Sequence, residues 1–258
     1  MFTYIQPRFE KGRVLKTEML EQVRDYPRVL ANIQYDEYSD GIINGANVTV
    51  DPAELIVAPG LVKFRDHLYM LEQPQRLFYK ATEQEQILRI RFEDHGSNSD
   101  FDRLAGVLVL GEQPPTPDEL ELGRFKLKQG AILRSDYVDF ADMVTEFNTW
   151  NPVSARYAGI GQDTLRPEIL HRFARELLQT GTQDAADYAF AFMVLNAQRI
   201  ERTVVEHYIA ARNQTEPGSG SNMRLHRQLT VILQDAARGK RSSSRWNGRS
   251  PGGRMIVD

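Results

Sequence analysis

The sequence predicts an α+β protein, in which a β-rich N-terminal domain of short antiparallel strands is followed by a C-terminal helical bundle. From about residue 36 to residue 130, apolar residues alternate in short runs that turn residues separate, as in a β-meander. After Gly130 the apolar residues recur at the spacing of amphipathic helices. The 258 residues, of which 41% are hydrophobic and 26% charged, are enough to bury a core in one large or two modest domains.

We divide the chain into four parts where its composition or hydrophobic period changes. An N-terminal arm and short helix occupy residues 1–35, and the β-rich domain occupies residues 36–130. The helical domain spans residues 135–237, and a basic flexible tail spans residues 238–258. Because the hydrophobic period switches near Gly130, we expect the two central parts to fold separately.

The first 35 residues favour an extended arm and one short helix. Thr17 is suited to cap a helix in which Met19, Leu20 and Val23 lie on one side. Pro27 is expected to end this helix or to kink it, because proline cannot donate the backbone hydrogen bond that a helix interior needs.

Turn residues delimit the expected strands, as at Asp40-Gly41, Asn44-Gly45 and Pro59-Gly60. Alternating apolar residues between these turns predict short strands at 48–50, 55–57, 61–64 and 67–71. Further strands are expected at 86–92, 104–110 and 122–128, with a polar loop between the first two of them. The first half of the chain is therefore predicted to be mostly β.

Amphipathic stripes predict four helices in the second half of the chain. They are expected at 137–150, 165–178, 185–212 and 225–236. The third is expected to be one long helix, with Phe192, Leu195 and Ile200 among the residues of its buried face. A segment rich in Gly and Ser at 216–221 is interpreted as a flexible linker before the last helix.

The composition excludes several classes of protein. The chain has no cysteine, which excludes a disulfide framework, a thiol nucleophile and a cysteine-ligated metal site. No apolar run approaches the roughly 20 residues of a membrane-spanning helix. The first residues lack the basic and then apolar order of a signal peptide, so we expect synthesis in a cytoplasm and no membrane partner.

No catalytic residue, cofactor site or metal site is predicted. The pair Gly239-Lys240 is followed by arginine and lacks the preceding glycine of a phosphate-binding loop. The spacing of Asp136, Asp139 and Asp142 would let them bind a divalent cation from one side of a helix. Aspartates near a helix start also complement the helix dipole, and we prefer this structural interpretation. The enzymatic alternative is a hydrolase whose site the spacing does not reveal.

Charge is unevenly distributed along the chain. Residues 1–237 carry 26 basic and 34 acidic side chains, a net charge of −8, whereas the last 21 residues carry six basic side chains and one acidic. We interpret the tail as a partner-binding segment that uses Arg238, Lys240, Arg241, Arg245, Trp246, Arg249 and Arg254. The alternative is a nucleic-acid arm in which Trp246 stacks on a base. The acidic body opposes that alternative, so nucleic acid is not the expected partner.

Residues 36–92 resemble the small β-modules of bacteriophage tail and baseplate proteins, including prophage contractile tails. The strand from Gly41 to Gly45 has the Gly-x-x-x-Gly pattern of those modules, and Val57 to Gly60 has the Val-x-Pro-Gly pattern of the following hairpin. The strand that ends the module follows, with Asp66 where a turn glycine is common and with Tyr69 in place. The resemblance extends loosely over residues 120–150, where Leu122-Gly-Arg-Phe-Lys-Leu-Lys-Gln-Gly-Ala131 is similar to tail-associated proteins.

This resemblance implies a function in assembly. It suggests a non-enzymatic structural component of a phage-like contractile tail, at the baseplate, that binds other tail or baseplate proteins and uses no cofactor. Homo-oligomerisation is left open, and the expected location is the bacterial cytoplasm during assembly and then the virion or tail particle. The alternative is a cytoplasmic regulator that binds nucleic acid through the basic tail.

Overall fold

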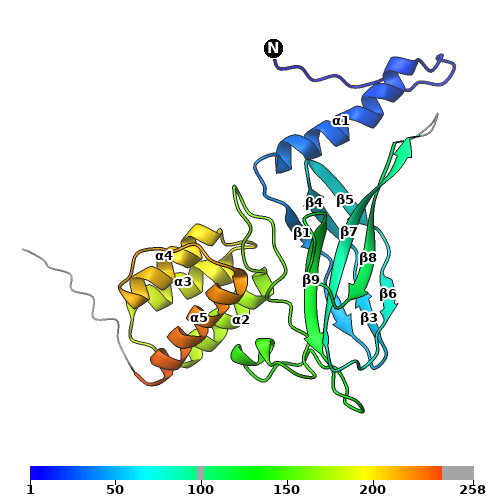
Figure 1. Cartoon of the computed structure of the whole chain (residues 1–258). Coiled ribbons are helices and arrows are strands. Elements are labelled where there is room, and N and C mark those ends of the chain that lie inside the picture. The colour runs from blue at the N-terminus through cyan, green and yellow to red at the C-terminus, as the bar shows by residue number, and fades with distance from the viewer. Residues whose placement is uncertain (98–101, 240–258) are drawn as a thin grey trace, which may run out of the picture.

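The computed structural model describes residues 1–97 and 102–239, and it confirms the predicted α+β class. A β-rich half and a C-terminal helical half lie side by side, and one long helix, α1 (Thr17–Tyr35), lies at the end of the β-rich half away from the bundle (Figure 1). Each half has its own buried apolar cluster. Independent folding of the two halves stays a prediction.

Six short strands form two three-stranded antiparallel sheets. The sheets have the orders β1-β4-β5 and β2-β3-β6. β2 pairs with β3, and β4 pairs with β5, as consecutive strands do in a meander. β1 pairs with β4 and β3 pairs with β6, so strands of the two sheets alternate along the sequence. The strands are β1 (Gly41–Gly45), β2 (Val48–Val50), β3 (Glu54–Val57), β4 (Gly60–Phe64), β5 (His67–Leu71) and β6 (Gln75–Phe78).

A third antiparallel sheet is larger and has the order β8-β7-β9. It consists of β7 (Glu85–Ser97), β8 (Asp102–Gly111) and β9 (Glu119–Lys126). Alternation places Leu88, Leu120 and Leu122 in the apolar cluster of the β-rich half, where they are fully buried together with Leu55 of the small sheets. The three sheets therefore share one core.

Two of the predicted turns, at Asn44-Gly45 and Pro59-Gly60, lie side by side where β1 pairs with β4. Gly45 pairs with Gly60, and Gly45 has a φ of +67°, in the left-handed region that favours glycine. A Cβ atom on Gly45 would clash with the Pro59 carbonyl, and one on Gly60 would clash with the Ala46 backbone nitrogen. These glycines therefore allow the ends of β1 and β4 to approach each other.

The helical half contains α2 (Pro167–Gln179), α3 (Ala185–Asn196), α4 (Arg202–Asn213) and α5 (Asn222–Ala237). Pro167 lies in the first turn of α2, where its missing N–H costs nothing, and Ser221 caps α5 by accepting from the Arg224 backbone N–H. Phe173, Leu177 and Leu229 form the centre of the bundle core and are completely buried.

The predicted helix at 137–150 is wrong, because only a single 3₁₀ turn, Ala141–Val144, forms there. The segment around it is held in other ways. The Tyr137 hydroxyl donates to the Trp150 carbonyl at 2.8 Å. The Arg134 guanidinium donates two hydrogen bonds of 2.7 Å to the Asp142 carboxylate. These side-chain contacts hold the backbone away from a continuous helix.

The single long helix predicted over 185–212 is also wrong. The chain leaves the helical conformation at Ala197, with φ −101° and ψ 142°, and α4 begins five residues later. In the break, the Ile200 carbonyl accepts a bond of 2.7 Å from the Thr164 hydroxyl, and Arg199 donates to the Ile43 carbonyl at 2.7 Å. Tertiary contacts outweigh helix propensity here.

The N-terminal helix was predicted to be short, but in the structure it spans 19 residues. It begins at Thr17, which is its first helical residue and not its cap, and continues through Pro27 to Tyr35. None of its residues is buried. No helix in the described part of the chain is both long enough and apolar enough to span a membrane.

Candidate functional site: apolar assembly surfaces

An uncharged apolar face of α3 is the first candidate site. Tyr188, Ala189, Phe192 and Met193 recur at helical spacing along this face, and all four are exposed, with Phe192 60% exposed. The charged residue of α3, Asp187, points to the opposite side and is buried. A helix that is apolar on all sides is normally covered on all sides. We name these four residues the α3 face.

The prediction that Phe192 and Leu195 lie on a buried face is wrong, because both side chains are exposed. The buried side of α3 consists of Asp187, Phe190, Ala191 and Val194. An apolar stripe at helical spacing indicates one buried face per helix, whereas α3 has a buried apolar face and an exposed one. The signal that would have found the second face is the absence of any exposed charge between Ala185 and Asn196.

The buried side of α3 is fixed by a polar cluster. The Asp187 carboxylate accepts from the Thr182 hydroxyl at 2.6 Å and from the Tyr208 hydroxyl at 2.8 Å, and forms an ion pair with Arg212 at 2.9 Å. Arg212 also binds Asp184, the N-cap residue of α3, at 2.9 Å. Burial and the Asp187 charge raise the pKa of Tyr208, which keeps its hydroxyl protonated. This cluster sets the orientation of the α3 face.

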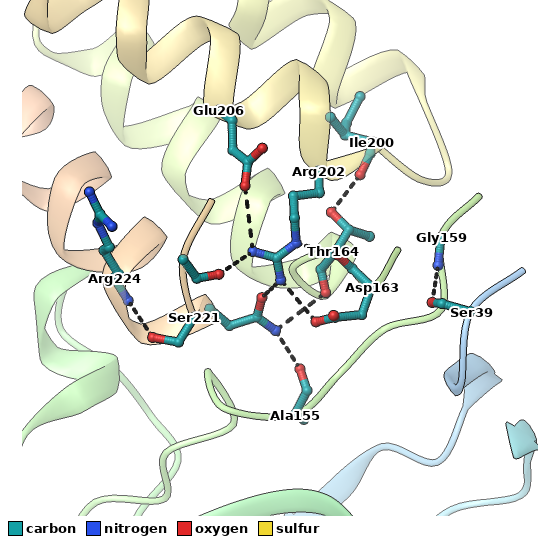
Figure 2. Close-up of polar contacts among 12 residues, drawn as sticks. Ser39, Ala155, Gly159, Asp163, Thr164, Ile200, Arg202, Glu206, Ser221 and Arg224 are labelled. Carbon is teal, nitrogen blue, oxygen red and sulfur yellow. Dashed lines mark hydrogen bonds and ion pairs between the residues drawn. The ribbon is translucent and has the colours of Figure 1, made fainter. Parts of the chain in front are cut away.

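A second network, around Arg202, joins the helical half to the loops beside it (Figure 2). Arg202 is buried and donates to the Asp163 carboxylate at 2.9 Å, to the Gly220 carbonyl at 2.7 Å and to the Asn222 side chain at 2.5 Å. Asn222 in turn donates to the Ala155 carbonyl at 2.9 Å. One guanidinium group therefore holds the start of α4, the start of α5 and the loop before α2 together.

Two further arginines of the helical half donate hydrogen bonds to backbone carbonyls of the β-rich half. Arg166, at the start of α2, donates to the Gly45 carbonyl at 3.0 Å and to the Ala46 carbonyl at 3.2 Å. The Arg199 guanidinium, which also binds β1, lies 4.7 Å from the ring centre of Tyr38 and 4.9 Å from that of Tyr157. These contacts position the α3 face relative to the sheets.

Two of the three aspartates that were considered as metal ligands, Asp139 and Asp142, serve the local fold, and Asp136 contributes its backbone carbonyl to Arg134. Asp142 binds Arg134 and accepts from the Val138 backbone N–H, and these contacts hold the pKa of its carboxyl well below the usual range. Asp139 accepts from the Asp142 backbone N–H at 2.8 Å. Within residues 1–97 and 102–239, no group of three or more His, Asp or Glu could hold a metal ion.

Several hollows open on the described surface, and two of them differ in polarity. One, of about 830 Å³, lies between α2, α5 and the loop that holds Tyr137. Part of its polar lining is already paired, because Arg172 pairs with Glu176 at 2.9 Å and donates to the Tyr137 carbonyl at 2.8 Å. The other, of about 380 Å³, is mostly apolar and lies between β5 and β8, where Met70 and Leu104 are exposed. The second hollow is a further candidate contact surface.

Of the predicted partner-binding tail, the described residues include only Arg238, which follows α5 as its C-cap residue and donates its backbone N–H to the Gln234 carbonyl. The remaining predicted residues, Lys240, Arg241, Arg245, Trp246, Arg249 and Arg254, lie outside the described residues.

One buried histidine predicts how stability depends on pH. His226 is completely buried, stacks on the Phe140 ring and binds the Phe140 carbonyl, and burial lowers its pKa to about 4. In the unfolded chain its pKa is about 6.5, so the unfolded state binds the proton first as pH falls. We expect the free energy of unfolding to fall by about 3 kcal/mol from this group between pH 6.5 and pH 4.

The measurement for His226 is urea unfolding at several pH values, with His226→Gln as the comparison. Other carboxyl groups titrate in the same window in both proteins, so the difference between the two curves isolates the histidine. The variant should lose less stability on acidification than the wild type. Parallel curves for the two proteins would refute the assignment.

No protein-family model matches the chain, and no curated protein matches it. A chain of the type VI secretion system TssK-TssF-TssG baseplate subcomplex is similar over 90% of this chain and 100% of its own, with 12% identity and a TM-score of 0.40. A crystal structure of TssK is similar over 91% of this chain and 72% of its own, with 10% identity and a TM-score of 0.38.

A third similar structure is a chain of the baseplate complex from the type VI secretion system. It is similar over 91% of this chain and 88% of its own, with 11% identity and a TM-score of 0.24. The three structures are thus parts of baseplate assemblies. Likeness at this level transfers no residue role to the present chain.

Proposed function

We propose that this chain is a structural component of a phage-like contractile tail, located at the baseplate, and that it binds other baseplate proteins. The observation that carries the proposal is the uncharged α3 face, since an aromatic and methionine surface of this kind is typical of the centre of a protein–protein interface. The phage-like class follows from the β-module resemblance of residues 36–92. The similar structures carry none of the argument.

The geometry supports a rigid binding surface. The Asp187 cluster fixes the helix from behind, and Arg166 and Arg199 fix the bundle on the sheets, so the α3 face is presented without rearrangement. A preorganised apolar surface loses little conformational entropy on binding. In this proposal the chain acts by positioning other proteins, and assembly takes place in the bacterial cytoplasm before the chain enters the tail particle.

The test is deletion of the gene in the organism that encodes it, with complementation by variants and counting of assembled tail particles by electron microscopy. We expect no assembled particles after deletion and full restoration by the wild-type gene. The double variant Phe192→Asp/Met193→Asp should fail to restore assembly, because charges on the α3 face cannot be buried in an apolar interface.

Gln198→Asp is the matched control, since it adds a charge at an exposed position outside the α3 face. It should restore assembly. Circular dichroism and thermal unfolding of both purified variants should match the wild type, since none of the substituted side chains is buried. Normal particles in the deletion strain would refute the proposed function, and normal particles with the double variant would refute the role of the α3 face.

The basic tail gives a separate prediction. We expect the full chain to bind random duplex and single-stranded DNA only weakly at physiological salt, because the body has a net charge of −8. Six basic side chains can make at most about six phosphate contacts, so any binding should weaken steeply as salt rises. Deletion of residues 238–258 should leave the fold intact.

A salt titration of DNA binding by the full and the truncated chain checks this prediction. Sub-micromolar binding at physiological salt that disappears on truncation would contradict it. That result would favour the alternative of a nucleic-acid-binding regulator.

A further inference from the structure

Helix α1 carries an apolar seam that its own chain leaves uncovered. Met19, Val23, Tyr26, Leu30 and Ile33 are spaced alternately by four and three residues, which is the a/d spacing of a coiled coil. The last four of these side chains are between 46% and 71% exposed. Leu20 and Val29, also about half exposed, flank the seam at the neighbouring e and g positions.

The charges of α1 are confined to the rest of its surface. With Val23 and Leu30 at position a, every charged residue of the helix falls at b, c or f, namely Glu18, Glu21, Arg24, Asp25 and Arg28. The a, d, e and g positions between Met19 and Gln34 carry no charge. A seam this wide exceeds the a/d stripe that two helices need, and it fits bundles of three or more helices.

The two flanks of the seam have opposite charge. In a parallel cyclic bundle, the flank with positions b and e of one helix faces the flank with positions c and g of the next. Position b carries Arg24, and position c carries Glu18 and Asp25. In the single chain Arg24 bonds to the adjacent Asp25 at 2.7 Å, so these groups already satisfy one another at the surface. Successive copies would extend this pairing from helix to helix.

The chain also fixes the direction in which α1 points. The buried Lys63 ammonium donates to the carbonyls of Tyr35, Asp36 and Tyr38, each at 2.8 Å, and so holds the C-terminal end of α1 on β4. The rest of the helix extends past the sheets (Figure 1). A helix with an interior proline and no buried residue has little to stabilise it in water unless another surface covers its seam.

We propose that α1 is the self-association element of this protein and that three or more copies of the chain pack their α1 helices in a parallel bundle. The proposal does not depend on the assembly function. The occupant is a copy of the same chain because the seam spacing is self-complementary and the b and c flanks attract each other. The polar side of α1 holds three acidic and two basic residues, which disfavours an anionic lipid surface.

The test measures the mass of the full-length protein by size exclusion with light scattering at rising concentration. We expect at least three times the monomer mass of 29.5 kDa. Val23→Glu/Leu30→Glu should give the monomer mass, because two seam residues then carry charges. Arg24→Glu should weaken association, and the exchange Glu18→Arg/Arg24→Glu/Asp25→Arg should restore it.

Asn32→Glu is the matched control, since it adds the same charge at an exposed c position outside the seam. It should keep the oligomer mass. Because the chain has no cysteine, Leu30→Cys and Arg28→Cys can be compared with a short bis-maleimide. Cross-linking of copies at Leu30 but not at the outward Arg28 is expected for a parallel bundle. All variants should keep the wild-type circular dichroism spectrum.

Three results would overturn the proposal. The first is a wild-type protein that stays monomeric at every concentration. The second is an oligomer whose mass the seam double variant leaves unchanged, and the third is an oligomer without cross-linking at Leu30. A monomer that sediments with phosphatidylcholine–phosphatidylglycerol vesicles through the same seam would assign α1 to a lipid surface instead.

Discussion

Replacing Arg202 with methionine is expected to lower the free energy of unfolding by about 3–5 kcal/mol. Methionine has a similar length but no charge, so Asp163 and the mostly buried Glu206 side chain lose their cation. The Gly220 carbonyl and the Asn222 side chain lose their donor as well. Each buried acceptor that is left without a partner costs about 1–3 kcal/mol, and no water can easily replace a guanidinium group that binds four groups at once.

Urea unfolding followed by tryptophan fluorescence, to which the buried Trp150 contributes, and by circular dichroism measures the effect of Arg202→Met. Arg224→Met is the control. Arg224 lies on α5, two residues after Asn222 of the network, but it is exposed and its bond to the Ser219 carbonyl is at the surface. This control should change stability by less than about 0.5 kcal/mol. Equal effects of the two substitutions would show that the Arg202 network contributes no more than a surface arginine.

Local patterns were sufficient to predict the elements whose partners lie nearby in sequence. The stripe over 165–178 predicted α2, and the structure places Ile169, Phe173 and Leu177 of that stripe in the core. The alternating runs predicted most of the strands, because each run has one face on a shared core. The fold class was predictable for the same reason.

Elements decided by distant contacts were not predictable. The break between α3 and α4 depends on Thr164 and on the backbone of Ile43, which are 36 and 156 residues away from their partners in the chain. Nothing in the local sequence at Ala197 marks the break, since neither glycine nor proline occurs there. The Arg202 network is equally invisible, because its members are ordinary polar residues until the fold brings them together.

The candidate surfaces were missed for a different reason. An apolar stripe is normally taken to face the core of its own chain, so Phe192 was expected to be buried in the helical bundle. The helix at the N-terminus was expected to be short. An apolar residue that serves another chain has the same local signal as a core residue. Only the fold shows which stripes exceed what the chain itself can cover.

Asp187→Ala is expected to lower the free energy of unfolding by about 3–5 kcal/mol, because it takes one of two carboxylate partners from the buried Arg212 and removes the acceptor of two buried hydroxyls. The Thr182 and Tyr208 hydroxyls lose their acceptor at the same time. Asp184 still binds Arg212 on the other side, but it lies at the helix start and cannot reach both hydroxyls in this geometry. Thermal and urea unfolding measure the loss.

The double variant Asp187→Leu/Arg212→Met distinguishes the cost of an unpaired charge from the value of the ion pair. Replacing both partners by apolar side chains removes the Asp187 and Arg212 charges together, so the double variant should be more stable than Arg212→Met, which leaves Asp187 buried without a cation. Asp184 loses Arg212 in both of these variants, so this loss cancels in the comparison. The Tyr208 hydroxyl still loses its acceptor in the double variant, so full wild-type stability is not expected. Additive losses would mean that Asp187 and Arg212 contribute independently, and would refute the view that their pairing fixes α3 against α4.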